Sequence, residues 1–382
     1  MRHSNLVNFL HPGAPKGLIP SASAWVQERN QAQTQLRRPQ APAWEREIFP
    51  AEENFNPLQF PFKPTPGEEF SQVRWTTTPA ASVFYIEGCR VLGNEAAVIS
   101  PDNRVFADFT LPPAEQWSDH ACFKRRRIPP VRPLKGWYAT ITWPESRFFF
   151  HWMIEALPRM AVLGEFASIL DGLFVPSPLQ NFHRESLALL GVDEAKLIPV
   201  DVNSHFAPQH LFIPRAFSMY NPPRWLHAWF KRSCLRPAAG AHPQRPAPKR
   251  IYVSRADAPV RRVTNEAQVA DMLARYGFES VRLSEHPFEA QARIFNQAEI
   301  IVGPHGAGLS NIVFCREGTS IIEALPPRWM APCFMALASS AGCRYRPLVA
   351  RETTPRSSPD PQRDDIEIPV GELEALVGAA LP

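Results

Sequence analysis

A short run of small residues containing one histidine has the composition of a phosphate-binding loop: Pro304, His305, Gly306, Ala307 and Gly308. The apolar stretch EIIVG before it predicts a buried strand, and LSNIVFC after it predicts a short helix. Small residues let the backbone approach an anion, and free amides at the start of a helix favour negative charge. A tight strand-to-helix turn would use the same glycines, so the loop by itself leaves both interpretations open.

Arginines follow a second predicted strand, RIYVS, in the same half of the chain. Arg255 ends this strand, and Arg261 and Arg262 come a few residues later. A guanidinium group matches diphosphate oxygens well, and parallel strands end at one edge of a sheet, where ligands usually bind. For Arg261 or Arg262 taken singly, a solvated loop is the simpler interpretation. Glu323 lies in the apolar run TSIIEALP, where a carboxylate needs a partner that a ribose diol would supply.

A second candidate site occurs earlier, in HWMIEALPR, where His151 and Glu155 are four residues apart. This spacing places both on one face of a predicted helix. An imidazole beside a carboxylate could act as a general base and its orienting partner. A structural hydrogen-bonded pair, a metal-binding pair and a weak surface contact are alternatives. The metal alternative lacks an evident third ligand and does not follow the His-Glu-x-x-His order of zinc peptidases, so no metal is expected.

Two α/β domains are predicted to position these residues. In the first, WYATIT predicts a strand, RFFFHWMIEALPRMAVLGEF a helix, and the segments from LFVP to HLFIP alternate as β-α-β. In the second, Thr264 is expected to cap a helix that ends before Gly277, and further strands and helices follow in a Rossmann-like order. The chain of 382 residues exceeds the usual size of one core, which also favours two domains.

Proline content suggests where the domains end, because the 42 prolines cluster outside the motifs. Residues 1–78 read as an irregular proline-rich arm with one helix around Ala24–Leu36. The other expected segments are an acceptor-side α/β domain over 79–236 with a β meander at 81–110, a hinge at 237–250, a donor domain at 251–350 and a tail at 351–382 with a short helix.

Charge and composition exclude several classes of protein. Lys and Arg number 41 against 37 Asp and Glu, a net charge of +4, which is too balanced for a nucleic-acid-coating protein. Six cysteines without a Cys-x-x-Cys pair indicate reduced residues of a cytoplasmic protein, and no apolar run is long enough to span a membrane. The basic cluster Lys124–Arg127 fits a solvated loop, which we favour, or a peripheral contact with anionic lipid at the inner membrane face.

Four sequence blocks, in this order and spacing, resemble glycosyltransferase family 61: FFFHWMIEALPR, RIYVSRADAPVRRVTNE, the run from YGFESV through IVGPHGAGLSNIVFC, and GTSIIEALPP. The resemblance covers roughly Tyr138 to Pro347. It implies a GT-B architecture with two Rossmann-like domains facing a cleft, inversion at the anomeric carbon, no required metal, and no cofactor besides the nucleotide-sugar co-substrate. Bacterial relatives are usually associated with capsule, exopolysaccharide or lipopolysaccharide assembly.

The resemblance also implies roles for individual residues. It places the catalytic base at Glu155 or His151, and Glu155 is favoured because related sequences tend to have a carboxylate there. In the second domain it places Arg255 and Arg262 on the donor diphosphate and Glu323 on the nucleotide ribose. The residues His305, Gly306, Ala307 and Gly308 would form the diphosphate loop.

The function expected from these features is transfer of a sugar from a nucleotide sugar, UDP-linked by preference, to a glycan or lipid-linked acceptor. A catalytically silent scaffold with the same fold, part of a polysaccharide assembly machine, is the alternative from another class. A dinucleotide-dependent oxidoreductase is disfavoured because no Gly-x-Gly-x-x-Gly follows the early strands.

Overall fold

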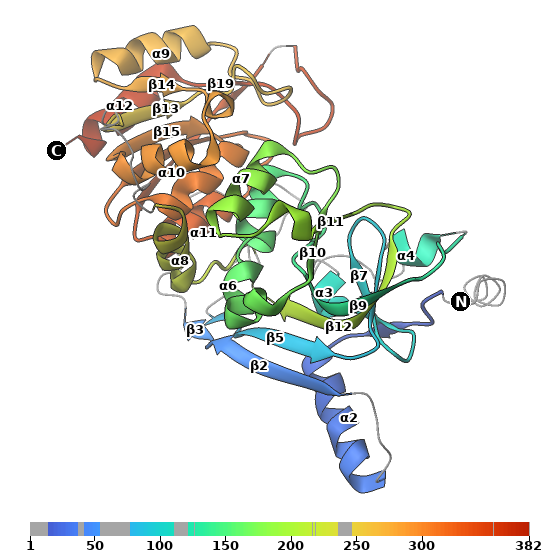
Figure 1. Cartoon of the computed structure of the whole chain (residues 1–382). Coiled ribbons are helices and arrows are strands. Elements are labelled where there is room, and N and C mark those ends of the chain that lie inside the picture. Colours follow the sequence, from blue (N-terminus) through green and yellow to red (C-terminus); the bar gives the residue numbers. More distant parts are fainter. Residues whose placement is uncertain are drawn as a thin grey trace. The chain divides into compact units, whose positions relative to one another are not determined.

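The computed structural model divides the chain into two compact units (Figure 1). Unit 1 contains the described residues up to Ala51 and Pro79–Phe217, and unit 2 contains Glu52–Thr78 and the residues from Ser218 onward. The expected arm therefore contributes to both units, and most of the expected hinge, 237–246, lies outside the described residues. The structure describes residues 14–36, 42–53, 77–110, 121–125, 127–215, 217, 219–235, 247–353 and 355–381.

Ten strands of the described part of unit 1 form one mixed sheet. The strands β9, β10 and β11 are mutually parallel neighbours and β12 is parallel to β9, which confirms the predicted β-α-β alternation. The antiparallel series β6-β7-β8 confirms the predicted meander. The strands are β1 (Leu18–Ile19), β2 (Ala43–Phe49), β5 (Ala81–Ile86), β6 (Arg90–Leu92), β7 (Ala97–Ile99), β8 (Val105–Phe106), β9 (Arg132–Thr140), β10 (Gly172–Pro176), β11 (Leu197–Val200) and β12 (His205–Arg215).

The prediction of an irregular arm is wrong for residues 43–49. This stretch forms β2, which pairs antiparallel with β5 over six positions. It contains no proline, so it can donate every ladder hydrogen bond, and the Trp44 ring stacks on Tyr85 with centroids 5.6 Å apart. The helix expected around Ala24–Leu36 is confirmed as α2 (Ala22–Leu36).

The helix expected across residues 147–166 is interrupted. It consists of α5 (Phe149–His151), a π-helical turn η3 (Trp152–Ala156), α6 (Arg159–Leu163) and the 3₁₀ turn η4 (Gly164–Ile169). Pro158 has no N–H to donate to the carbonyl four residues earlier, and the amide of Leu157 instead bonds to Trp152 O, five residues back, at 2.7 Å. Single π turns of this kind occur frequently at functional sites. The remaining helical elements of unit 1 are α3 (Ala107–Thr110), α4 (Ala121–Lys124), α7 (Asn181–Leu189) and η5 (Glu194–Lys196).

Unit 2 contains a five-stranded sheet in which all neighbours are parallel, in the order β14-β13-β15-β16-β17. In chain order this is 2-1-3-4-5, so the direction of winding reverses between β13 and β15, the switch point where doubly wound sheets bind ligands. The three central strands, β13, β15 and β16, are almost wholly buried, as expected for a parallel sheet covered on both faces, whereas the edge strands β14 and β17 are partly exposed. They are β13 (Arg250–Val253), β14 (Glu279–Val281), β15 (Ile300–Pro304), β16 (Ser320–Leu325) and β17 (Arg344–Val349).

Helices cover both faces of this sheet (Figure 1). On one face, α9 (Glu266–Arg275) and α12 (Val370–Ala380) pack into a shared core with the strands, which confirms that the terminal helix docks on the body. On the other face lie α10 (Phe288–Gln297), the 3₁₀ helix η7 (Ala307–Phe314) and α11 (Cys333–Ser340). Also in unit 2 are α8 (Arg224–Cys234), η6 (Leu283–Glu285), and the strand pairs β3 (Glu52–Glu53) with β4 (Thr77–Thr78) and β18 (Arg351–Glu352) with β19 (Ile366–Glu367).

Three local predictions for unit 2 need correction. The first residue before α9 is Asn265, not Thr264, whose hydroxyl instead donates to Ile366 O at 3.2 Å. The helix after the glycine loop is 3₁₀ rather than α. The division at Phe217 assigns α8 to unit 2, where His227 bonds to Val313 O and Ser340 Oγ, whereas a boundary at residue 236 was expected. The left-handed Gly277 after α9 is confirmed (φ 73°).

Within the described residues, no helix is both long enough and apolar enough to cross a lipid bilayer.

Candidate functional site

The switch point of unit 2 brings Arg255 against the glycine loop. Arg255 follows β13, and His305 and Gly306 follow β15, its neighbour in the sheet. A Cβ atom added to Gly306 would lie 1.9 Å from Nη1 of Arg255, so the guanidinium occupies the space that any other side chain would need. The sequence predicted only that Arg255 and Gly306 follow parallel strands that end at one edge of the sheet. In the structure they are in direct contact, and only glycine at position 306 lets the guanidinium come this close.

The guanidinium of Arg255 is held by the loop that follows it. Its Nε donates to Arg261 O at 3.1 Å and its Nη2 to Val260 O at 2.8 Å. Burial lowers the pKa of Arg255 from its usual value, and the carboxylate of Asp257 opposes this. The remaining nitrogen, Nη1, lies against Gly306. The guanidinium therefore holds a positive charge in a fixed position at the carboxyl ends of β13 and β15.

Backbone amides add to this charge. The amide of His305 donates to Ala324 O (2.8 Å) and that of Leu309 to Gly306 O (2.9 Å). For the three amides between them, those of residues 306–308, the described part of the chain offers no hydrogen-bond acceptor. Successive amides next to an arginine make a concave anion site.

Arg261, and not Arg262, is the second arginine near Arg255. The Arg261 guanidinium carbon lies 5.0 Å from the ring centre of Trp329, whose ring meets His305 edge to face at 4.8 Å. Burial and the neighbouring charge of Arg255 lower the pKa of Arg261 to about 10, and its buried Nε has no partner in the described residues. Arg262 instead forms an ion pair with Asp365 at 3.1 Å.

Glu323 is fully buried and already bonded at both oxygens. His305 Nδ1–H donates to Oε1 and the Tyr345 hydroxyl to Oε2, each at 2.5 Å. Burial, followed by the charge of Glu323, raises the pKa of Tyr345 well above its usual value. Glu323 has no exposed surface for a ribose to reach, so the geometry fits orientation of His305 better than the ribose contact expected from the sequence.

In unit 1, the π turn brings His151 and Glu155 together. Nδ1 of His151 is 2.7 Å from Oε2 of Glu155, and because a carboxylate only accepts, Nδ1–H is the donor. The Glu155 side chain is 8% exposed and the His151 side chain 25% exposed. In this dyad of His151 and Glu155, the carboxylate is therefore the more buried group and the imidazole the more exposed one. The same arrangement occurs where a buried carboxylate orients a histidine base.

Arg159 was missed by the sequence analysis, although it lies four residues after Glu155 in the same motif. Its Nε donates to Glu155 O at 3.0 Å and its guanidinium lies over the Trp143 ring at 4.6 Å. Burial lowers the pKa of Arg159 to about 10, and the charge of Glu155 opposes the shift. Trp329 and Tyr345 were also missed, because no local pattern indicates which distant residues meet in space, and Arg261 was named but interpreted singly as part of a solvated loop.

His183 anchors the π turn and makes its stability depend on pH. The ring accepts from the Gln180 amide (2.9 Å), donates to Ser146 O (3.1 Å) and packs edge to face on Trp152 (4.6 Å). Burial lowers the pKa of His183 from 6.5 to about 4. Since the folded pKa is the lower one, the neutral ring stabilises the fold above about pH 6.5, and this contribution is lost as the pH falls toward 4.

We therefore expect the free energy of unfolding to fall by about 2 kcal/mol between pH 7 and pH 5 through this ring alone. Urea unfolding at the two pH values measures the change. His183→Gln should reduce it by about that amount while lowering stability at pH 7, and the buried His227, whose pKa burial also lowers to about 4, should account for part of the remainder. An equal pH dependence in wild type and His183→Gln would contradict the assignment.

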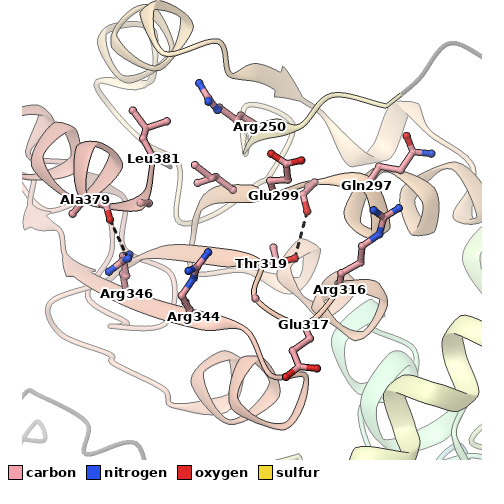
Figure 2. Close-up of a pocket in the computed structure, with 14 residues that line it drawn as sticks. Arg250, Gln297, Glu299, Arg316, Glu317, Thr319, Arg344, Arg346, Ala379 and Leu381 are labelled. Carbon is pink, nitrogen blue, oxygen red and sulfur yellow. Dashed lines mark hydrogen bonds between the residues drawn. The ribbon is translucent and has the colours of Figure 1, made fainter.

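A cavity of about 500 Å³ lies at the opposite edge of the unit 2 sheet, where the strands begin. Arg250 donates there to Tyr276 O (2.6 Å) and Arg346 to Ala379 O (3.2 Å). Both carbonyls are at helix C-termini, where positive side chains offset partial negative charge. Figure 2 shows these arginines with Arg316 and Arg344 around the cavity, which none of the predicted site residues lines. The cavity is therefore separate from the candidate site at the switch point.

No group of three or more His, Cys, Asp or Glu side chains in the described residues is arranged to hold a metal ion.

Comparison with known proteins agrees with the four sequence blocks. Residues 149–322 match the family model described as Glycosyltransferase 61. The match begins at the helical segment that carries His151 and Glu155. It extends past Arg255 and the glycine loop into β16, and it ends at the residue before Glu323. A search of curated proteins found no match to the chain. This segment, which carries His151, Glu155, Arg255 and the glycine loop, is similar to glycosyltransferase family 61.

Proposed function

We propose that this protein is an inverting glycosyltransferase that moves a sugar from a nucleotide sugar, UDP-linked by preference, to a hydroxyl of a glycan or lipid-linked acceptor. The match to the family supports a sugar donor and an acceptor in general terms. The observation that carries the proposal furthest is the contact of Arg255 with Gly306 at the switch point of unit 2. A role in bacterial surface polysaccharide assembly, at the cytoplasmic face of the membrane, completes the proposal.

Unit 2 would bind the donor. Arg255 and the amides of residues 306–308 present positive charge where a diphosphate can sit, and Arg261 adds a second guanidinium nearby. As the bond between the anomeric carbon and the β-phosphate oxygen breaks, negative charge grows on the departing nucleoside diphosphate. Fixed cations and amides stabilise that charge without having to reorganise.

Unit 1 would supply the base. We propose His151 for this role, because its ring is the more exposed member of the dyad and its Nδ1–H is bound by Glu155. The bond leaves the Nε2 lone pair to accept the proton of the acceptor hydroxyl, and Glu155 stabilises the imidazolium that forms. This assignment reverses the preference for Glu155 drawn from the family resemblance.

The reaction would be a single displacement. The acceptor oxygen bonds to the anomeric carbon on the face opposite the leaving diphosphate, so the configuration inverts and no covalent glycosyl-enzyme forms. Neither a metal nor a cofactor besides the nucleotide sugar takes part in the proposed chemistry. The GT-B organisation implied by the family resemblance is part of the proposal.

Two measurements test this function. Thermal unfolding with UDP, GDP, CDP and ADP should show a rise in Tm with one nucleotide, since a ligand that binds only the folded state stabilises it. A panel of nucleotide sugars should then reveal one donor from which nucleoside diphosphate is slowly released. Absence of any Tm shift would reject the transferase, whereas binding without release from any donor, with or without acceptor glycans, would favour the scaffold.

A further inference from the structure

We propose that the C-terminal segment Ser357–Ile368 holds the loops that border the donor site, and that Asp365 acts as a positioning residue for Arg255. This inference rests on the proposed donor site. The family match ends at residue 322, so the segment lies outside the matched region. No motif in its sequence indicates a role for it.

The segment runs beside the loop that follows Arg255. Ile366 forms a parallel bridge with Val263, through bonds from its amide to Arg262 O (3.0 Å) and from the Thr264 amide to its carbonyl (2.9 Å). Asn265 exchanges two further bonds with the backbone of Ile368, at 2.8 and 3.0 Å. These contacts fix the strand-like path of residues 262–265.

Asp365 fixes the end of the loop nearest Arg255. Its Oδ1 accepts from the Arg262 amide at 2.8 Å, and its Oδ2 accepts from Nε and Nη2 of Arg262 at 3.3 and 3.1 Å. Its side chain is 8% exposed, so these bonds are largely shielded from water. The peptide between Arg261 and Arg262 is therefore held from one side by a single carboxylate.

That peptide is the one that orients Arg255. Its carbonyl, Arg261 O, accepts from Arg255 Nε, and Arg261 itself has a left-handed backbone with φ 53°. A left-handed conformation in a residue other than glycine persists where surrounding contacts impose it. The contacts of Asp365 with Arg262 are next to this residue, so they help to impose the backbone that presents the carbonyl to Arg255.

A second contact ties the same segment to the loop over His305. Asp364 accepts from Arg328 Nη1 at 3.1 Å and also closes the turn at Ser357 and Ser358 with three bonds of 2.9 to 3.1 Å. Arg328 precedes Trp329, whose ring packs on His305. The two adjacent aspartates thus hold the two loops that border the candidate donor site.

A double-mutant cycle tests the coupling, with UDP as the probe and titration calorimetry as the measurement. Asp365→Ala should weaken UDP binding about tenfold, whereas Asp365→Asn, which keeps an acceptor for the Arg262 amide, should weaken it less. In an Arg255→Ala background, Asp365→Ala should cause no further loss. Equal losses of affinity in both backgrounds would show that Asp365 does not act through Arg255 and would overturn the inference. The matched control is Glu367→Gln, which removes a charge from the same segment at a side chain that faces Arg351.

Hydrogen exchange separates this inference from the proposed function. In Asp365→Ala, the amides of residues 255–262 should exchange faster than in wild type and in Glu367→Gln. Unchanged exchange in that loop would reject the positioning role even if UDP binds. If wild type bound no nucleotide at all, the donor assignment would fail, and the exchange rates would still decide whether Asp365 holds the loop.

Discussion

His151→Ala is expected to lower kcat by about 10²- to 10⁴-fold, the usual contribution of a positioned general base. Without the imidazole, the dyad lacks its more exposed group, which is the one proposed to accept the proton of the acceptor hydroxyl. Affinity for the donor nucleotide should not change, because that site is proposed for unit 2. Initial rates with saturating donor measure kcat, and calorimetry measures UDP affinity.

Added imidazole should restore part of the activity of His151→Ala, since a diffusible base can replace a missing ring. Glu155→Gln should also reduce kcat, because it removes the charge that stabilises the imidazolium. Glu165→Gln is the matched control: Glu165 lies in η4, beyond α6, and in the described residues its side chain pairs only with the exposed Arg46, so the kcat of this variant should equal that of wild type. If His151→Ala retained more activity than Glu155→Gln and did not respond to imidazole, the base would be Glu155.

Arg255→Ala is expected to weaken UDP binding by about 10- to 100-fold, the range for losing hydrogen bonds to a charged group. The Tm rise that UDP produces in wild type should then disappear at the same ligand concentration. Gly306→Ala should mimic this loss, because the new Cβ would displace the Arg255 guanidinium from a position 1.9 Å away.

The control for this prediction is Arg316→Ala, which removes a guanidinium from the cavity at the opposite edge of the same sheet. Its affinity for UDP should match that of wild type. If Arg316→Ala lost the Tm shift and Arg255→Ala kept it, the nucleotide would bind at the cavity, and the assignment to the switch point would be wrong.

Secondary structure was predictable where one local signal was strong. Apolar strands such as Ile300–Pro304 and Ser320–Leu325, and a left-handed glycine after a helix at Gly277, each depend on neighbouring residues only. The strand Ala43–Phe49 was missed, because the prolines around it suggested an irregular arm and because its partner, β5, is more than thirty residues away. Pairing with a distant strand is a tertiary event that a window of sequence does not contain.

For the site, the chemistry of the chain could be read from residue types and spacing. An imidazole four residues before a carboxylate, a glycine loop after a buried strand and an arginine after another strand are local patterns, and the family match covers all three. The partners of those residues could not be read in this way. Glu323 is occupied by His305 and Tyr345, and Arg262 by Asp365. Hydrogen bonds between residues 18 to 103 positions apart are chosen by packing, which only the folded chain determines.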